Sequence, residues 1–250
     1  MIRGSVMNLF KTSFFTTISA IFVLFFSNVS SATSVIEPIK DPEVLDLVFI
    51  LDKSGSMSGF ESDTVGGYNS VLTENRNKAN KTFITTILFN NKTSLLHNRE
   101  PIDKVKNLTL NDYSVGGNTA LLDAIGDSII KMRENRKITK NNNVLFVIIT
   151  DGEENSSTKY SQAKIKSMIK SAEVEDKWDF IFLGANIDAI AEADNIGIKR
   201  SNATGYVQDG TGYDKAYKAV NKAVEAKQSA APISEEWKQE VEQDAKDRKK

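Results

Sequence analysis

The chain of 250 residues contains no cysteine, one histidine and only four prolines. Without cysteine it forms no disulfide, holds no metal through thiolates and offers no thiol nucleophile. An excess of charge of one sign is also missing, since 32 basic and 33 acidic residues give a net charge of −1. Such a balance provides no electrostatic reason to expect nucleic acid or an anionic membrane as the main partner. Any metal site must be built from oxygen, which suits Mg²⁺, Ca²⁺ or Mn²⁺.

The composition is otherwise that of a globular protein. Hydrophobic residues make up 40% of the chain and charged residues 26%, a balance that can bury a sizeable core. The length corresponds to one ordinary domain with appendages. We therefore expect a single folded domain, residues 43–228, and shorter segments on both sides of it.

The first 32 residues have the pattern of a secretory signal peptide. Arg3 and Lys11 precede an apolar run from Phe14 to Phe26, and small residues follow up to Ala32. The alternative is an uncleaved anchor helix, but the apolar stretch is well short of the roughly 20 residues that span a bilayer. We expect cleavage after Ala32, a linker over residues 33–42, and no stable membrane insertion afterwards. The predicted location is secreted or in the cell envelope or periplasm.

Four nearly continuous apolar runs predict parallel strands that are covered on both faces. These runs are Val44–Leu51, Thr82–Phe89, Asn143–Ile149 and Asp179–Leu183. Apolar residues with helical spacing follow Thr119 and Asp151, and a further helix is expected from Thr211 to Gln228. The segment Thr93–Arg99 follows its preceding strand too closely for a crossover helix and predicts an antiparallel edge strand. The pattern predicts a doubly wound α/β fold, with a mostly parallel sheet and helices on both faces.

Oxygen-bearing side chains follow the first predicted strand at every second position. The strand runs into Asp52, and Ser54 and Ser56 come next, with Gly55 allowing a turn that aims all three side chains at one point. A carboxylate and two hydroxyls are hard donors of the kind that Mg²⁺ and Ca²⁺ prefer. This short pattern arises by chance in many chains and is weak evidence by itself.

Two further segments strengthen the prediction of a metal site. Thr119 follows a pair of glycines at the start of a predicted helix, and Asp151 ends another apolar strand. Parallel strands end at the edge of the sheet where open α/β folds bind ligands. We therefore expect Asp52, Ser54, Ser56, Thr119 and Asp151 to meet at one edge.

In this order and strand context, the five residues resemble the metal-ion-dependent adhesion site (MIDAS) of von Willebrand factor A (VWA) domains. The resemblance covers most of the chain after residue 43 and is closest to small bacterial stand-alone VWA proteins. It implies a VWA domain in which Ser54 and Ser56 ligate the metal directly and Thr119 does so directly or through water. Asp52 and Asp151 would hold coordinated waters. The expected cofactor is Mg²⁺, with Mn²⁺ or Ca²⁺ as alternatives, and a partner protein would supply an Asp or Glu carboxylate.

Three neighbouring features have open interpretations. Glu153 and Glu154 either add charge near the cation or, as we prefer, lie in the first turn of the next helix. Gly66 and Gly67 interrupt a predicted helix and indicate close packing or a kink. Residues 229–250 predict a charged C-terminal helix, whose apolar stripe through Trp237 either docks on the domain or binds a partner.

The leading functional hypothesis is a cation-dependent protein-binding module of the adhesion type. The alternative is an assembly or chaperone-like factor that works with an ATPase or a metal-resistance system. We expect no enzyme, because a phosphatase of the haloacid dehalogenase type needs a second aspartate where Ser54 stands. The chain also has no G-x-S-x-G elbow and no nucleotide-binding glycine loop.

Overall fold

The computed structural model describes residues 44–78, 81–141 and 143–248, which belong to one unit, Lys40–Lys250. The predicted signal peptide and linker lie outside the described residues. Within these ranges, no helix has both the length and the apolar character needed to cross a membrane.

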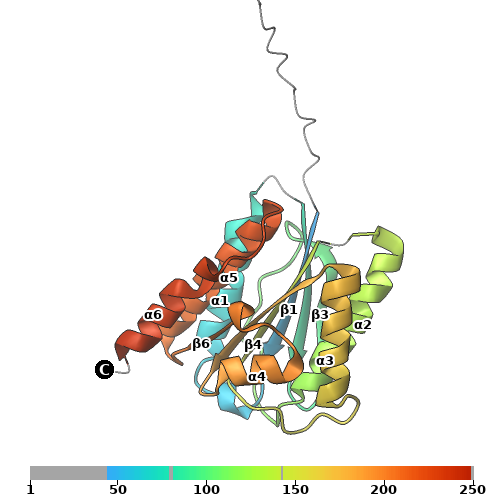
Figure 1. Cartoon of the computed structure of the whole chain (residues 1–250). Helices are drawn as coiled ribbons and strands as arrows, with labels where there is room; N and C mark the ends of the chain where they lie inside the picture. Colours follow the sequence, from blue (N-terminus) through green and yellow to red (C-terminus); the bar gives the residue numbers. More distant parts are fainter. Residues whose placement is uncertain (1–43, 79–80, 142, 249–250) are drawn as a thin grey trace, which may run out of the picture. The chain divides into compact units, whose positions relative to one another are not determined.

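The described chain forms a six-stranded sheet with the order β3-β2-β1-β4-β5-β6 (Figure 1). Its strands are β1 (Leu45–Asp52), β2 (Thr82–Phe89), β3 (Thr93–Pro101), β4 (Val144–Thr150), β5 (Asp179–Ala185) and β6 (Ala203–Tyr206). All neighbouring pairs are parallel except β2 and β3, which form an antiparallel pair at one edge. The predicted fold class and the predicted edge strand are confirmed.

Helices cover both faces of this sheet. One face carries α1 (Glu61–Arg76) and α5 (Gly210–Gln228), and the other carries α2 (Leu121–Thr139), α3 (Gln162–Ser171) and α4 (Ala189–Ile196). Every residue of β1 is buried, and alternate side chains of this strand enter two separate hydrophobic clusters. Phe49, for example, packs towards α1 and α5, and Ile50 packs towards α2 and α3. This double coverage explains why the strand reads as a continuous apolar run.

The C-terminal segment docks on the domain through its apolar stripe. A short 3-10 turn, Glu235–Lys238, leads into α6 (Gln239–Arg248), and Trp237 and Val241 are buried. Trp237 Nε1 donates to the backbone oxygen of Ser201 at 3.0 Å. The buried Lys238 Nζ donates to the backbone oxygens of Arg200 at 2.8 Å and Ala203 at 3.0 Å. These contacts fix the helix beside the edge strand β6.

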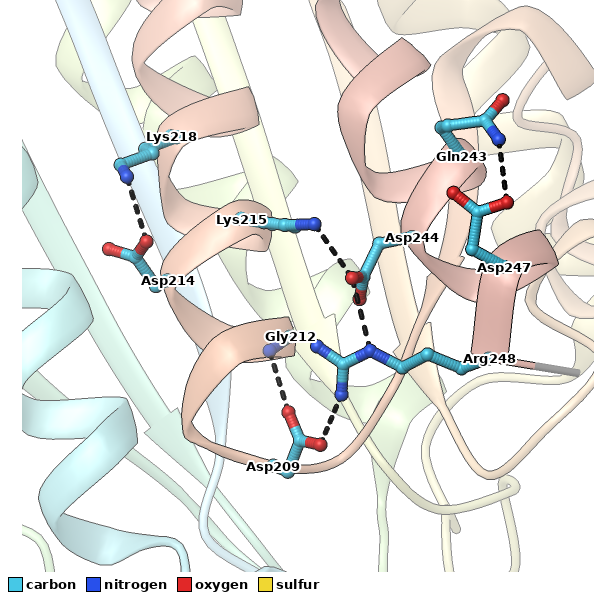
Figure 2. Close-up of polar contacts among 9 residues, drawn as sticks. All are labelled: Asp209, Gly212, Asp214, Lys215, Lys218, Gln243, Asp244, Asp247 and Arg248. Atoms are coloured by element: carbon cyan, nitrogen blue, oxygen red, sulfur yellow. Dashed lines mark hydrogen bonds and ion pairs between the residues drawn. The ribbon is translucent and has the colours of Figure 1, made fainter.

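Ion pairs tie the far end of α6 to the start of α5 (Figure 2). Asp244 accepts from Lys215 Nζ at 2.7 Å and from Arg248 Nε at 3.0 Å. The Arg248 guanidinium also pairs with Asp209, whose other oxygen accepts from the backbone N–H of Gly212 at 2.8 Å. Asp209 is the N-cap residue of α5, so α6 is anchored to the loop between β6 and α5.

The two adjacent glycines of α1 have different surroundings. A methyl group on Gly67 would lie 1.9 Å from the ring of Tyr217 on α5, closer than any real contact. A methyl group on Gly66 would meet nothing within 4 Å. Gly67 therefore permits the close approach of α1 and α5, whereas Gly66 only reduces helix propensity.

These two positions give a matched pair of substitutions. We expect Gly67→Ala to lower the free energy of unfolding by about 1–3 kcal/mol, because Tyr217 is buried and must shift. Gly66→Ala should raise it by about 0.5–1 kcal/mol through helix propensity. Urea denaturation of the three proteins measures both changes. Equal effects of the two substitutions would contradict the packing role of Gly67.

Candidate metal site

The predicted site residues lie at the carboxyl ends of two paired strands. Asp52 is the last residue of β1, and Asp151 directly follows β4. These strands are parallel neighbours, with Leu51 opposite Ile149, so both carboxylates emerge at one edge. The positions of both acids follow from the register of the two central strands.

Three hydroxyl groups converge beside Asp151. Ser54 Oγ and Ser56 Oγ are 3.1 Å apart, and Ser56 Oγ donates to Asp151 Oδ1 at 2.5 Å. A methyl group on Gly152 would lie 3.0 Å from Thr119 Oγ1, 3.3 Å from Ser56 Oγ and 3.9 Å from Ser54 Oγ. One point beside Gly152 is thus close to all three hydroxyls, and glycine leaves that point open. The structure brings all five predicted residues together.

Asp52 is the fully buried carboxylate of the group. Its Oδ1 accepts from the backbone N–H of Ser54 at 2.7 Å, and its Oδ2 accepts from Thr150 Oγ1 at 2.6 Å. Burial raises the pKa of Asp52 to about 6, although the hydrogen bonds from Thr150 and Ser54 lower it. Burial also raises the pKa of Asp151. The two acids therefore bind protons more tightly than exposed aspartates do.

The glycine loop before Thr119 is joined to the loop after β1. Gly55 N–H donates to the backbone oxygen of Gly117, and Gly116 N–H donates to that of Lys53, both at 2.9 Å. Gly117 has a φ of 84°, and a methyl group there would lie 2.1 Å from Asn91 Oδ1. A side chain at position 117 would thus be strained and would clash with Asn91, which explains the glycine.

The loop after Asp151 also holds Thr119 in place, through Asn155. Asn155 Oδ1 accepts from Thr119 N–H at 2.9 Å, and Asn155 N–H donates to the backbone oxygen of Thr119 at 3.1 Å. The same loop is bound further along to the start of α2. There, the Asp123 carboxylate accepts from the backbone N–H groups of Thr158 and Lys159, both at 2.9 Å.

The predicted place of Glu153 and Glu154 in the first turn of the next helix is wrong. The helix α3 begins only at Gln162. Glu154 Oε2 instead accepts from the backbone N–H of Leu122 at 2.9 Å, in the first turn of α2. The carboxylate thus stabilises the preceding helix rather than the following one, because free N–H groups at any helix start attract acids. Glu153 is exposed.

Gln208 is a site residue that the sequence did not indicate. Its Nε2 donates to Asp151 Oδ2, and its Oε1 accepts from Asn186 Nδ2. Gln208 follows β6, a strand of four residues that was too short to be predicted. A glutamine after an unrecognised strand carries no signal of its own.

The donor set fits a hard divalent cation. Three hydroxyls and two carboxylates offer oxygen only, as Mg²⁺, Mn²⁺ and Ca²⁺ prefer. Among the described residues, no three His, Cys, Asp or Glu side chains gather as a metal-binding group. The candidate site differs from such groups because most of its donors are hydroxyls.

Comparisons with known proteins support the resemblance. Residues 18–174, more than half of the chain, match the family described as "VWA domain containing CoxE-like protein". No curated protein matches the sequence.

Solved structures at low sequence identity share the fold. Proximal thread matrix protein 1 from the mussel byssus, with a zinc-occupied MIDAS motif, has a TM-score of 0.51 and 17% identity over 75% of this chain and 47% of its own. A von Willebrand factor type A protein from Catenulispora acidiphila has a TM-score of 0.53 and 14% identity, covering 72% of this chain and 42% of its own. The pilus adhesin SpaC from Lactobacillus rhamnosus GG reaches 0.58 at 12% identity, covering 74% and 30%. The chain thus spans less than half the length of each.

We predict that Mg²⁺ or Mn²⁺ stabilises the protein through these residues. A cation that binds only the folded state, at one hundred times its Kd, adds about 2.7 kcal/mol. For a chain of this size the melting temperature should rise by about 5–10 °C. Ser54→Ala and Asp151→Ala should lose this rise in a thermal unfolding experiment with Mg²⁺ or EDTA. Ser62→Ala, an exposed serine on α1, is the matched control and should keep it. An undiminished rise in both site variants would place the cation elsewhere.

The raised pKa of Asp52 predicts a pH dependence. The pKa is about 6 in the folded chain against an ordinary 3.8, so stabilisation by the bound proton is lost as pH rises through about 6. In EDTA, the free energy of unfolding relative to Asp52→Asn should therefore fall from about pH 4, near the ordinary pKa, to just above pH 6, the pKa in the folded chain. A cation competes with that proton, so the rise in melting temperature with Mg²⁺ should increase over the same interval. If the difference in free energy of unfolding between the unchanged protein and Asp52→Asn did not vary with pH, Asp52 would not be the group that titrates near pH 6.

Proposed function

The chain belongs to the family of VWA domain containing CoxE-like proteins, and on this premise we propose that it is a divalent-cation-dependent protein-binding module. Its partner would present an Asp or Glu carboxylate to the bound cation. The observation that carries the proposal is the convergence of the three hydroxyls and Asp151 at the carboxyl-terminal edge of the sheet.

The residues of the site fit this role by their charge. Ser54, Ser56 and Thr119 would hold the cation through neutral oxygens, and Asp52 and Asp151 would hold its waters. Both oxygens of Asp52 already accept hydrogen bonds from the chain, which favours an indirect role. Because its direct ligands would be neutral hydroxyls, the bound cation would keep most of its positive charge. It would therefore attract a carboxylate from a partner. We propose Mg²⁺, with Mn²⁺ or Ca²⁺ as alternatives.

We further propose that the protein is not an enzyme. The histidine, His97, lies on β3, where its Nδ1 is 3.2 Å from Tyr68 Oη and 3.1 Å from Thr86 Oγ1. Burial lowers the pKa of His97, and its hydrogen-bond partners lie on α1 and β2, not at the candidate site. The candidate site therefore has no general base beyond its two aspartates.

A second candidate function is an assembly or chaperone-like factor working with an ATPase or a metal-resistance system. The CoxE-like description of the matching family favours it. The two functions share the metal site and differ in the partner. The expected signal peptide, residues 1–32, favours an exported binding module, and we propose export on that ground.

Selection from a random peptide library tests the binding function. Peptides are bound to the immobilised protein in Mg²⁺ and released with EDTA. Each enriched peptide should contain Asp or Glu, and its replacement by Asn or Gln should weaken binding by at least about tenfold, as for loss of a charge-assisted contact. Thr119→Ala should release the same peptides, and Ser62→Ala should retain them. Enrichment that is indifferent to EDTA or to acidic residues would refute the function.

A further inference from the structure

A groove with a volume of about 880 Å³ lies beside the metal site. It is lined by the turn between β5 and α4, by the end of β6 with the residues that follow, and by the outer part of α6. The volume falls within the range of about 300–1,000 Å³ that is typical of ligand sites. It corresponds to roughly 10 Å on a side, or about three residues of extended chain.

The groove adjoins the candidate metal site through one side chain, Gln208. Gln208 lines it and donates to Asp151, the carboxylate beside the converging hydroxyls. Asn186 also lines it and donates to Gln208. A ligand that reaches the cation beside Asp151 therefore lies close to the groove, because Gln208 contacts both.

The lining of the groove combines apolar and acidic side chains. Ile187, Ile190 and Val207 are half-buried and form the apolar part. The charged lining residues are Glu153, Asp188, Glu242 and Lys246, three acids against one base. An extended segment with both apolar and charged side chains matches such a surface.

The acids of the lining differ in their partners. Glu242 pairs with Lys238 at 3.1 Å, which partly balances its charge. Asp188 Oδ1 caps α4 by accepting from Ala191 N–H at 3.0 Å, a contact that leaves the negative charge in place. Glu153 is exposed. With Lys238 and Lys246 counted against the three acids, the charge around the groove stays negative in sum.

The pKa of Glu192, on α4, is affected by some of the same charges. Burial raises its pKa first, and the charges of Glu153, Glu154 and Asp188 raise it further. A second carboxylate on a ligand would meet the same repulsion in the groove, whereas a cation would be attracted.

The α6 wall of the groove is held in place before any ligand arrives. Arg248 joins Asp244 on α6 to Asp209, the residue after Gln208 (Figure 2). Because this wall is already ordered, less conformational entropy is lost when a ligand binds.

We propose that this groove is the second half of the ligand site and receives a Lys or Arg side chain of the partner segment. That base would lie within about three residues of the Asp or Glu that completes the metal site. The inference rests on the proposed function, because the partner's carboxylate, bound at the cation, fixes where the partner segment lies relative to the groove. Glu153 and Asp188 would pair with the base, and the apolar lining would contact its aliphatic stem.

An array of short synthetic peptides tests this arrangement. Each peptide carries one central aspartate, and lysine, glutamine or glutamate is placed in turn at every other position. Binding of the full chain is measured in Mg²⁺ and in EDTA. Lysine within about three positions of the aspartate should bind about threefold to tenfold more tightly than glutamine, and glutamate more weakly. High salt should reduce the difference.

The double variant Glu153→Gln, Asp188→Asn should lose the preference for lysine. Asparagine also caps helices, so α4 should keep its start. The control double variant Glu74→Gln, Glu134→Gln removes the same two charges from exposed positions on α1 and α2 and should keep the preference. The rise in melting temperature with Mg²⁺ checks that each variant is folded.

The two proposals fail in different ways. Binding that needs Mg²⁺ and aspartate but is indifferent to lysine would overturn the groove proposal and leave the binding function standing. A lysine preference that persists in the Glu153→Gln, Asp188→Asn variant would also overturn the groove proposal. An array without Mg²⁺-dependent binding would overturn both.

Discussion

The parallel pairing of β1 with β4 is the constraint on which the candidate site depends. It brings Asp52 and Asp151 to one edge, although 98 residues separate them along the chain. Two hydrophobic clusters enforce the register, because every residue of β1 is buried and a slip by one position would exchange its two faces. The packing of apolar side chains on both faces of β1 thus fixes the positions of the polar side chains at the site.

Loops complete the site, and their own side chains hold them. Asn155 fixes Thr119, and Glu154 and Asp123 join the loop after β4 to the start of α2. On the other side, Gln208 connects Asp151 to the loop between β6 and α5, which α6 anchors through Arg248. Segments far apart in sequence therefore meet around one small cluster of oxygens, and the C-terminal helix contributes to its surroundings.

The strongest sequence signals corresponded to the most deeply buried elements. Continuous apolar runs predicted β1, β2, β4 and β5, and the fold class followed from them. The strand β6 and the helix α4 were missed, because four and eight residues give little periodicity. Gln208 was missed with β6. Glu154 was misassigned, because an acid near a helix start does not reveal which helix it caps. The five candidate residues come together as expected, but their binding of a cation, and export, remain predictions.

Both oxygens of Asp151 accept hydrogen bonds from the chain itself, from Ser56 Oγ and from Gln208 Nε2. The fold thus satisfies this carboxylate from its own residues, unlike small zinc domains that depend on their ion to fold. Assembly of the domain would then be independent of cation supply, and the ion would act as a reversible component added afterwards. The strength with which the protein holds a partner would follow the ionic content of its surroundings at each moment, rather than being fixed at synthesis.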